Sequence, residues 1–425
     1  MVIIFKPLAI RGINWFGILF ICLKVMNRFI LVLFLLNVSI TVLSQKIKEG
    51  YWGAKLLIQE GKEIPIKMQV LKQRLFILND TEKIELEAGL KRNDSIIFQF
   101  HTFNTCLSVK INQKNMSGYF VNNDRKSNKQ IPFLANYCNQ KNIMSPTQTD
   151  YFVGGKWKVI FSPDQDGQYP AIGQFEQNNL GQLSGTFRTE TGDYRFLSGN
   201  IIDDKMTLYC FDGSHTFLFE ANLKDEKLNG IFYSGLHWRT NWIGERDEEF
   251  ELSDPNEITF LSDSAEAFSF SKPQLNGERY YFPNETTKDK VVIIQIIGTW
   301  CPNCLDETLF FNELYNEFHE DGLEIIGIAY EVPADFVDQV SRIKNFKDKR
   351  NVKYPILVGG KASKSVASED FPMLNKISSF PTSIILNKTG EIEQIHTGFN
   401  GPGTGKVYDE YVIKMRELIK QLIEE

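Results

Sequence analysis

The chain has 425 residues, which is long enough for two or three domains, and its 42% of hydrophobic and 13% of aromatic residues suffice for packed cores. The 47 lysines and arginines against 53 aspartates and glutamates leave a net charge of −6, and no basic block stands out along the sequence. This charge balance gives no indication of a nucleic-acid partner.

Residues 1–44 have the pattern of a segment for export. A short positive region around Arg28 precedes the apolar stretch from Phe29 to Leu43, which is too short to span a membrane comfortably. Small residues then stand at the positions that favour cleavage before Gln45. We therefore expect a signal peptide, with residues 1–25 as an extension upstream of the true start, and a retained membrane anchor as the alternative.

Residues 45–252 predict a β-rich N-terminal region. Short, partly alternating apolar runs are separated by turn residues, and no long helical period occurs. The run from Asp94 to Phe100 parallels the run from Asp204 to Cys210, at a period of roughly 110 residues that is too long for a solenoid. This parallel predicts two related β modules, near 50–140 and 150–250, with chance similarity of amphipathic strands as the alternative.

This β-rich region offers no catalytic group of its own. Its histidines, His101, His215 and His237, are isolated, so we see no catalytic constellation around any of them. Its many aromatic residues are of the kind that mostly forms the core of strands. We therefore interpret residues 45–252 as a docking or spacer region.

Export would place the three cysteines of the β-rich region, Cys106, Cys138 and Cys210, in an oxidising compartment, where disulfides persist. Cys210 alternates with apolar residues in a strand-like run, so we expect a buried thiol there. Cys106 and Cys138 could form a disulfide with each other or stay buried as small apolar residues, and the sequence leaves both alternatives open.

An acidic linker at 253–267 and a single α/β domain at 268–425 are predicted for the rest of the chain. Turn-forming residues break the pattern in the first segment, and strands then alternate with helices in the second. The elements expected in the domain are a hairpin of 268–271 with 279–282, a strand at 291–297, a helix from 304, a strand at 323–329, a helix at 334–347, a strand at 354–358 that Gly359 and Gly360 end, a helix at 367–377, a hairpin of 383–386 with 392–396, and a helix at 408–423.

Two cysteines lie where the buried strand from Val291 to Ile297 is followed by a helix. The unsatisfied N–H groups of a helix N-terminus favour negative charge, so Cys301 is the expected nucleophile. Cys304, one turn further along, can resolve a mixed disulfide. The sequence supplies no second C-x-x-C for a zinc site, so we expect no metal and no cofactor beyond a redox-active disulfide between Cys301 and Cys304. A purely structural disulfide is the alternative.

The motif W-C-P-N-C at 300–304, directly after a buried strand, resembles the redox motif of a thioredoxin fold. With Glu307 added, it resembles the W-C-x-x-C-x-x-E of TlpA/ResA-like thiol-disulfide oxidoreductases, whose members are exported. The segment from Glu331 to Ile377 resembles the strand–helix insertion of this group. The resemblance covers about 268–425 and leaves the β-rich region outside it. It implies a thioredoxin-like domain in which Trp300 flanks the nucleophile.

Phe380-Pro381-Thr382, directly before a strand, matches the position of the cis-proline loop opposite the C-x-x-C of thioredoxin-like folds. The resemblance, not the sequence pattern, implies the cis isomer, because few X-Pro bonds are cis. The backbone beside Pro381 would then offer hydrogen bonds to an extended substrate, and Phe380 and Thr382 would shape what fits.

Between the cysteines stand Pro302 and Asn303, where many relatives of this family have proline second. Proline is tolerated in the first turn of a helix, so the fold is unaffected. The intervening pair tunes the stability of the reduced state, so the family's redox potential does not transfer to this chain.

Glu307 is a candidate proton carrier. It lies one turn past Cys304 on the same helix, where burial should raise its pKa and allow it to exchange a proton with the resolving thiol. A solvated helix carboxylate is the alternative, and we expect that environment for the neighbouring Asp306.

The sequence thus predicts an exported thiol-disulfide oxidoreductase of the periplasm or cell envelope. The resemblance implies a reductant that is fed by a membrane electron donor and acts on disulfides of exported proteins or on apocytochrome c. The alternative is a non-enzymatic exported binding or docking protein with a structural C-x-x-C disulfide.

Overall fold

A computed structural model describes residues 47–92, 94–138, 149–262 and 267–425, and the predictions for residues 1–44 lie outside these ranges. Ile47 to Glu425 form one compact unit. Within the described ranges, no helix is both long and apolar enough to cross a membrane.

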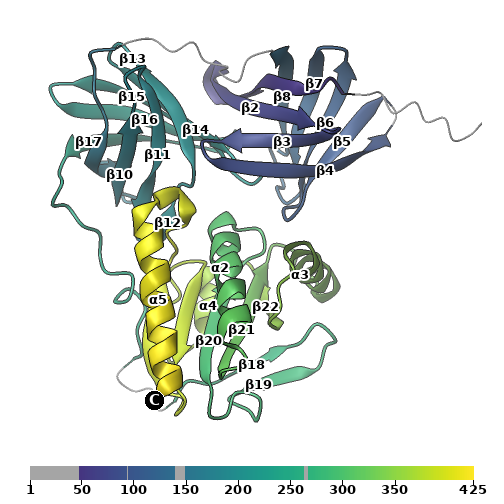
Figure 1. The fold of residues 1–425 in the computed structure, drawn as a ribbon, viewed down its shortest axis with the longest axis vertical. Helices are drawn as coiled ribbons and strands as arrows, with labels where there is room; N and C mark the ends of the chain where they lie inside the picture. Colours follow the sequence, from purple (N-terminus) through teal and green to yellow (C-terminus); the bar gives the residue numbers. More distant parts are fainter. Residues whose placement is uncertain (1–46, 93, 139–148, 263–266) are drawn as a thin grey trace, which may run out of the picture. The chain divides into compact units, whose positions relative to one another are not determined.

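The first eight strands close into an antiparallel barrel (Figure 1). They are β1 (Gly50–Leu57), β2 (Glu63–Leu71), β3 (Arg74–Asn79), β4 (Glu82–Arg92), β5 (Ser95–Phe100), β6 (Thr105–Asn112), β7 (Asn115–Asn122) and β8 (Gln130–Cys138), with a 3-10 turn η1 (Gln59–Gly61) after β1. Each strand pairs with the next, and β1 also pairs with β8. Along β1 every second side chain is buried, including Trp52, Ala54 and Leu56, which is the alternation expected of a strand with one face in a core.

A second antiparallel sheet of nine strands follows. Its strands are β9 (Gly155–Phe161), β10 (Tyr169–Gln177), β11 (Gln182–Thr189), β12 (Gly192–Asp193), β13 (Leu197–Ile202), β14 (Lys205–Phe211), β15 (Thr216–Lys224), β16 (Lys227–Ser234) and β17 (Trp238–Arg246). Because β10 pairs with both β9 and β11, this sheet also curls onto itself.

The two β regions share a local detail at their first strands. The indole Nε1 of Trp52 donates to Lys48 O at 3.0 Å, and that of Trp157 donates to Val153 O at 2.8 Å. In addition, β5 to β8 lead back to β1 by antiparallel pairing, as β14 to β17 lead back to β9. The segments that parallel each other in the sequence therefore occupy equivalent places in the two sheets.

The C-terminal part is an α/β domain with a five-stranded sheet. Its elements are β18 (Phe270–Pro273), β19 (Arg279–Phe282), β20 (Val291–Ile297), α2 (Pro302–Phe318), β21 (Leu323–Glu331), α3 (Phe336–Arg350), β22 (Ile356–Lys361), α4 (Lys364–Asp370), β23 (Thr382–Leu386), β24 (Ile392–Thr397), the 3-10 turn η2 (Pro402–Thr404) and α5 (Lys406–Glu424). The strand order is β22-β21-β20-β23-β24, with β18 and β19 as a separate hairpin. The predicted fold class, an all-β region in two parts followed by a thioredoxin-like domain, is confirmed.

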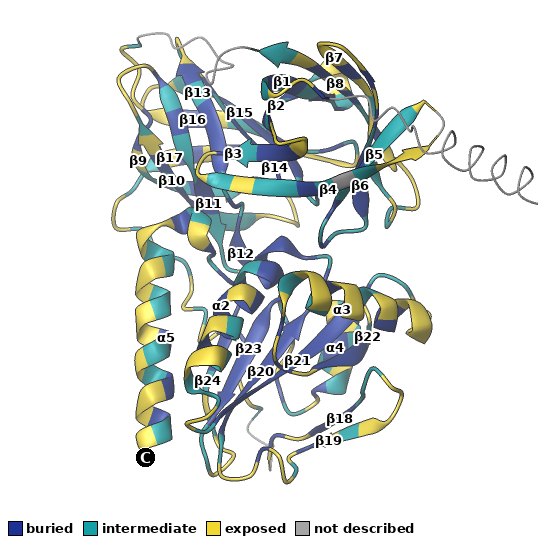
Figure 2. Cartoon of the chain, turned by 45° about the vertical axis from the view of Figure 1, so that its right-hand side comes forward, coloured by how far each residue is buried: buried dark blue, intermediate teal, exposed yellow. Residues whose placement is uncertain are grey.

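The central strand β20 is buried along its whole length, and Figure 2 shows the neighbouring strands buried as well, whereas α5 keeps an exposed side. Each buried Val or Ile side chain contributes about 1.5–3 kcal/mol relative to an exposed one. The strand therefore anchors the redox motif that follows it to the buried core of the domain.

Several element boundaries in this domain differ from the prediction, and two of the differences have a clear local cause. Strand β22 continues through Gly359 and Gly360, because Gly359 lets the backbone pass Tyr330, whose ring would lie 2.8 Å from an added Cβ. The predicted helix at 367–377 ends at Asp370, because Pro372 disfavours helical geometry at the residue before it.

The predicted linker is hydrogen-bonded to the C-terminal domain at several points. Thr397 N donates to Pro255 O at 2.9 Å, and Ser262 N donates to Met373 O at the same distance. Residues Pro255 to Ser262 therefore run along the thioredoxin-like domain instead of standing clear of it.

Candidate active site

Cys301 lies at the N-cap of α2, where the chain leaves β20. Its Sγ accepts a hydrogen bond from the backbone N–H of Cys304 at 3.3 Å and lies 3.5 Å from Phe380 O. Cys301 is the outer of the two cysteines, because 7% of its surface is exposed, whereas Cys304 has no exposed surface. Both cysteines carry free thiols in this structure.

Burial raises the pKa of the Cys304 thiol well above its usual range, and the neighbouring Cys301 adds to the effect. The two thiols are therefore unlike. Cys301 stands at the opening and at the positive end of a helix, while Cys304 needs a nearby base before it can act as a nucleophile.

Glu307 supplies a candidate for that base. Its side chain has no exposed surface, and burial raises its pKa to about 8, although Gln295 and Ser383 oppose the shift. Gln295 Nε2 donates to Glu307 Oε2 at 2.9 Å, and within the described residues Oε1 has no hydrogen-bond partner. The predicted rise in pKa is confirmed, and the alternative of a solvated carboxylate is wrong.

Sequence reasoning missed Gln295, which orients this carboxyl group. The residue is the only polar side chain in the strand sequence V-V-I-I-Q-I-I, and it also accepts a hydrogen bond from Tyr354 Oη at 2.8 Å. A single amide in an otherwise apolar, fully buried strand was the available signal, because a buried amide requires polar partners.

Replacement of Glu307 by glutamine is expected to slow resolution by Cys304 and to remove the rate increase near pH 8, where the wild-type carboxyl ionises. The raised pKa also implies that the folded protein binds a proton that the unfolded chain releases between about pH 4.5 and 8. Wild-type stability should therefore fall with rising pH in this window, by at most about 1.4 kcal/mol per pH unit for this group, and the variant should show a flatter profile.

Stopped-flow kinetics and urea unfolding from pH 5 to 9, a range about the thiol and carboxyl reference values, measure both effects. Glu313→Gln is the matched control on the same helix, because the Glu313 side chain is 63% exposed. Identical kinetics for wild type and Glu307→Gln across this range would remove Glu307 from the mechanism.

The Phe380-Pro381-Thr382 loop lies opposite the cysteines, as the resemblance implied, and the Phe380–Pro381 peptide bond is cis. The rings of Trp300 and Phe380 meet edge to face with centroids 6.0 Å apart. Trp300 Nε1 donates to Tyr330 O at 2.9 Å, and Thr382 Oγ1 donates to Ser379 O at 2.9 Å. Trp300 and Phe380 thus form an aromatic edge beside Cys301.

The second β sheet reaches the residues between the cysteines. Asn303 Nδ2 donates to Asp193 O at 3.1 Å, to Asp193 Oδ1 at 3.2 Å and to Phe399 O at 3.1 Å. Gly192, with φ of +130°, allows this approach, since a Cβ there would lie 2.6 Å from Asn303 Nδ2. The prediction of a docking or spacer role did not anticipate this contact.

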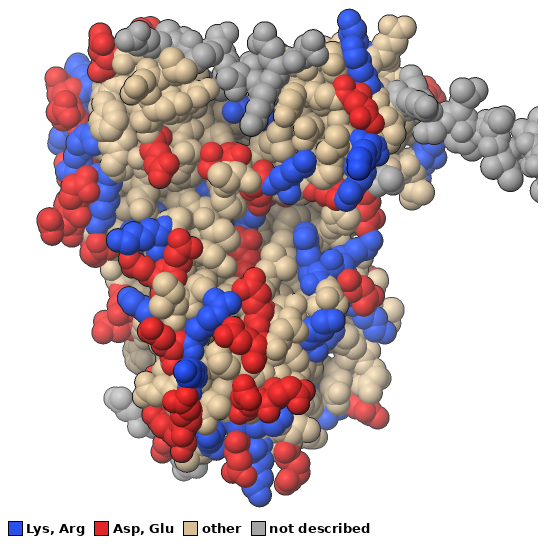
Figure 3. Space-filling view, in the orientation of Figure 1, with Lys and Arg blue, Asp and Glu red and all other residues tan. Residues whose placement is uncertain are grey.

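Arg195, in the loop after β12, is the buried cation behind the motif. Its Nη1 donates to Pro302 O at 3.3 Å and to Asp306, Nη2 donates to Glu82, and Nε lies 3.2 Å from Asp212 Oδ2. The Arg195 side chain is only 5% exposed. It thus differs from the charged side chains at the surface, where both signs are interspersed over the face that Figure 3 shows.

The expectation of a solvated Asp306 is wrong. Its side chain is 10% exposed, because this side of α2 faces the Arg195 loop instead of water. Burial raises the pKa of Asp306 to about 7, because the effect of burial exceeds the lowering that the charge of Arg195 causes. The helical pattern of the sequence could not indicate that a residue 111 positions away supplies a cation to Asp306.

A cavity of about 370 Å³ opens beside Cys301, between the redox motif and the second β sheet. His215 lines it together with Trp300, Cys301 and Phe380. The interpretation of His215 as isolated is therefore wrong, because the turn after β14 places it at the redox site and next to Asp212.

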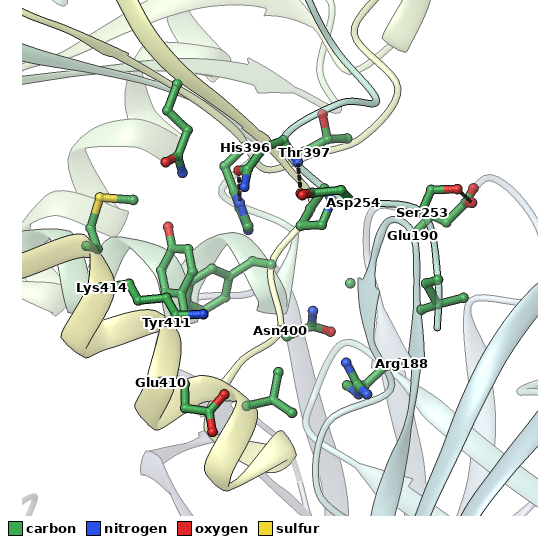
Figure 4. A pocket seen from close by; sticks show the side chains of 18 of the residues that line it. Arg188, Glu190, Ser253, Asp254, His396, Thr397, Asn400, Glu410, Tyr411 and Lys414 are labelled. Atoms are coloured by element: carbon green, nitrogen blue, oxygen red, sulfur yellow. Dashed lines mark hydrogen bonds between the residues drawn. The ribbon is translucent and has the colours of Figure 1, made fainter. Parts of the chain in front are cut away.

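A larger cavity of about 470 Å³ lies between the segment around Asp254, strand β24 and helix α5 (Figure 4). His396 Nδ1 lies 2.9 Å from Asn256 Oδ1 at its wall, and burial lowers the pKa of His396 to about 4. No cysteine lines this cavity, so we place the thiol chemistry in the smaller one.

Cys106 carries a free thiol in β6, so the alternative of a disulfide with Cys138 is not realised in this structure. Cys210 is fully buried in β14, as predicted for a core residue, and burial raises the pKa of its thiol well above the usual range. The redox pair is therefore the only place, within the described ranges, where two free thiols share one helix turn.

Residues 264–395 match the family model described as the AhpC/TSA family. The chain is 30% identical over 152 residues to the thiol-disulfide oxidoreductase ResA of Bacillus thuringiensis subsp. konkukian, a match that covers 35% of this chain and 76% of the relative. It is 28% identical over 160 residues to ResA of Halalkalibacterium halodurans, covering 36% and 76% respectively.

Among solved structures, the chain matches StoA from Bacillus subtilis at 24% identity and a TM-score of 0.26, covering 36% of this chain and 97% of that one. A thiol-disulfide oxidoreductase from Bacteroides fragilis is similar at 19% identity and a TM-score of 0.27, covering 34% and 99%. Each of these matches covers about a third of this chain.

Proposed function

Because the chain belongs, through its C-terminal domain, to the ResA-like thiol-disulfide oxidoreductases, we propose that it reduces disulfides of exported proteins with the dithiol of Cys301 and Cys304. The observation that carries this proposal is the asymmetry of the pair. One thiol caps a helix at an opening, and the other is buried beside a carboxyl group with a pKa of about 8.

In the proposed reaction the Cys301 thiolate attacks a substrate disulfide, forms a mixed disulfide and releases one substrate thiol. Cys304 then gives its proton to Glu307 and attacks Cys301 Sγ, which releases the second substrate thiol. The protein dithiol is oxidised to a disulfide by two electrons, and the substrate disulfide is reduced. The backbone beside Pro381 would hold an extended substrate segment, with Phe380 and Thr382 beside it.

The proposal also covers the compartment, the electron donor and the substrates. The export pattern of residues 1–44 supports a site of action in the periplasm or cell envelope. In that compartment, a reductant needs a membrane electron donor to return its disulfide to the dithiol, and exported proteins with disulfides, including apocytochrome c, are the proposed substrates.

Cys304→Ser tests the proposal by trapping. Without the resolving thiol, the reduced variant should accumulate a mixed disulfide between Cys301 and a disulfide-containing protein, which mass spectrometry detects as an adduct that dithiothreitol removes. The double variant Cys301→Ser/Cys304→Ser should form none. A Cys304→Ser protein that stays unmodified in excess substrate would overturn the proposed function.

A further inference from the structure

His215 is held in a fixed orientation at the cavity that it shares with Cys301. Its Nδ1 lies 3.0 Å from Asp212 Oδ2, and its ring stacks on Phe217 with centroids 4.4 Å apart. Among the residues that the structure describes, Nε2 has no hydrogen-bond partner, and 29% of the side chain is exposed. Nε2 is therefore not taken up by another described residue and is available to a molecule bound in the cavity that His215 lines.

Asp212 stays charged behind the imidazole. Burial alone would raise its pKa, but His215 and Arg195 outweigh that effect and lower the pKa to about 2. A permanent carboxylate on one ring nitrogen fixes the orientation of the imidazole and leaves its other nitrogen pointing away from Asp212. The pair Asp212–His215 thus has the geometry of an oriented acid–base group.

The turn that carries His215 is tied to the redox motif. Ser214 Oγ donates to Trp300 O at 3.3 Å, directly before Cys301 in the chain. The backbone N–H groups of Ser214 and His215 in turn donate to Asp212 Oδ1, at 2.9 and 2.6 Å. These bonds fix the position of the histidine relative to the cysteine.

We propose that His215 is a further catalytic residue, which protonates the thiolate that leaves the substrate disulfide. The inference rests on the proposed function. The Cys301 thiolate attacks one sulfur of the substrate, the substrate S–S bond breaks, and its electron pair departs on the other sulfur. The imidazolium of His215 gives that sulfur the proton of Nε2 and becomes neutral imidazole.

His215 and Glu307 then serve different sulfurs from different sides. Glu307 is fully buried and adjusts the protonation of Cys304, while His215 lines the cavity in which the substrate sulfur must lie. The β-rich region thereby supplies a chemical group to the thioredoxin-like domain.

Other charged or titratable groups surround the imidazole. Arg195 pairs with the same carboxylate, and His237 is close enough for its pKa to be lowered in part by His215. The titratable groups that share the cavity with His215 are Tyr169, Glu190, Asp193, Tyr194 and Cys301.

Two small disulfides with different leaving thiols test this role. In oxidised glutathione the leaving thiol is an alkyl thiol with a pKa near 8.5, whereas dithiobis-nitrobenzoate releases a far more acidic aromatic thiol that needs no proton. His215→Ala should slow reduction of oxidised glutathione about 100-fold, the lower range of general acid catalysis. Reduction of the aromatic disulfide should change less than about threefold, because an acidic thiol leaves without help.

His215→Gln should behave like His215→Ala, since glutamine can form hydrogen bonds but cannot deliver this proton. His101→Ala is the matched control, because His101 is 30% exposed, lies 3.2 Å from the carboxylate of Glu87 and does not line the cavity. Equal losses on both disulfides, or no loss on either, would overturn the role of His215. Wild-type protein that reduces neither disulfide would instead contradict the proposed function.

Discussion

Cys301→Ser is expected to lower insulin reduction to the uncatalysed rate. The substitution removes the only sulfur of the pair that has exposed surface, and the buried Cys304 has a strongly raised pKa that makes it a poor replacement. The fold should survive, because a serine hydroxyl can accept the hydrogen bond from Cys304 N–H and serine is a preferred N-cap residue. The free energy of unfolding should therefore change by less than about 1 kcal/mol.

The insulin turbidity assay with dithiothreitol as electron source measures the activity, and urea unfolding measures the stability. Cys106→Ser is the matched control, since Cys106 has 8% exposure against 7% for Cys301 and lies in the β barrel. Insulin reduction that persists in a folded Cys301→Ser protein would assign the chemistry to another group.

Arg195→Met is expected to lower the free energy of unfolding by about 3–5 kcal/mol at pH 7, the cost of leaving buried charges without their partner. Asp306, Asp212 and Glu82 all lose the same cation, and each side chain is at most 14% exposed. Methionine fills a similar volume, so the loss reports charge more than packing. The loss should be smaller at pH 5, because carboxyl groups without the cation take up protons more readily.

Urea unfolding at the two pH values measures this effect. The matched control is Arg416→Met, because Arg416 bridges Glu313 and Glu317 on the surface and is 31% exposed. Surface ion pairs of this kind contribute at most about 1 kcal/mol. A loss for Arg195→Met no larger than that of the control would mean that the buried cluster adds nothing net to stability.

Local sequence patterns predicted the redox pair well. An apolar strand followed by W-C-P-N-C places Cys301 at a helix N-terminus, and helical spacing places Glu307 on the inner side near Cys304. These relations lie within one strand–helix unit, where the period of the backbone decides which side chains meet. The proline loop was found through resemblance, because a proline before a strand carries little information by itself.

Long-range partners of the motif were not predictable in the same way. Arg195 meets Asp306 across 111 residues, and Asn303 meets Asp193 across 110. Neither pairing follows from periodicity, because it depends on how the second β sheet packs against the C-terminal domain. For the same reason, His215 looked isolated and Asp306 looked solvated until the tertiary contacts were known.

Residues of the second β region form hydrogen bonds with Pro302 and Asn303. The redox potential of the motif therefore need not follow from the sequence of the motif alone. The two residues between the cysteines are expected to tune the stability of the reduced state. Here Asn303 donates a hydrogen bond to Asp193, and Arg195 donates one to Pro302 O. Residues more than a hundred positions upstream therefore help to form the surroundings of the two sulfurs. We therefore expect substitutions at Asp193 or Arg195 to alter the redox potential while W-C-P-N-C stays unchanged, so that two chains with identical motifs can differ in potential.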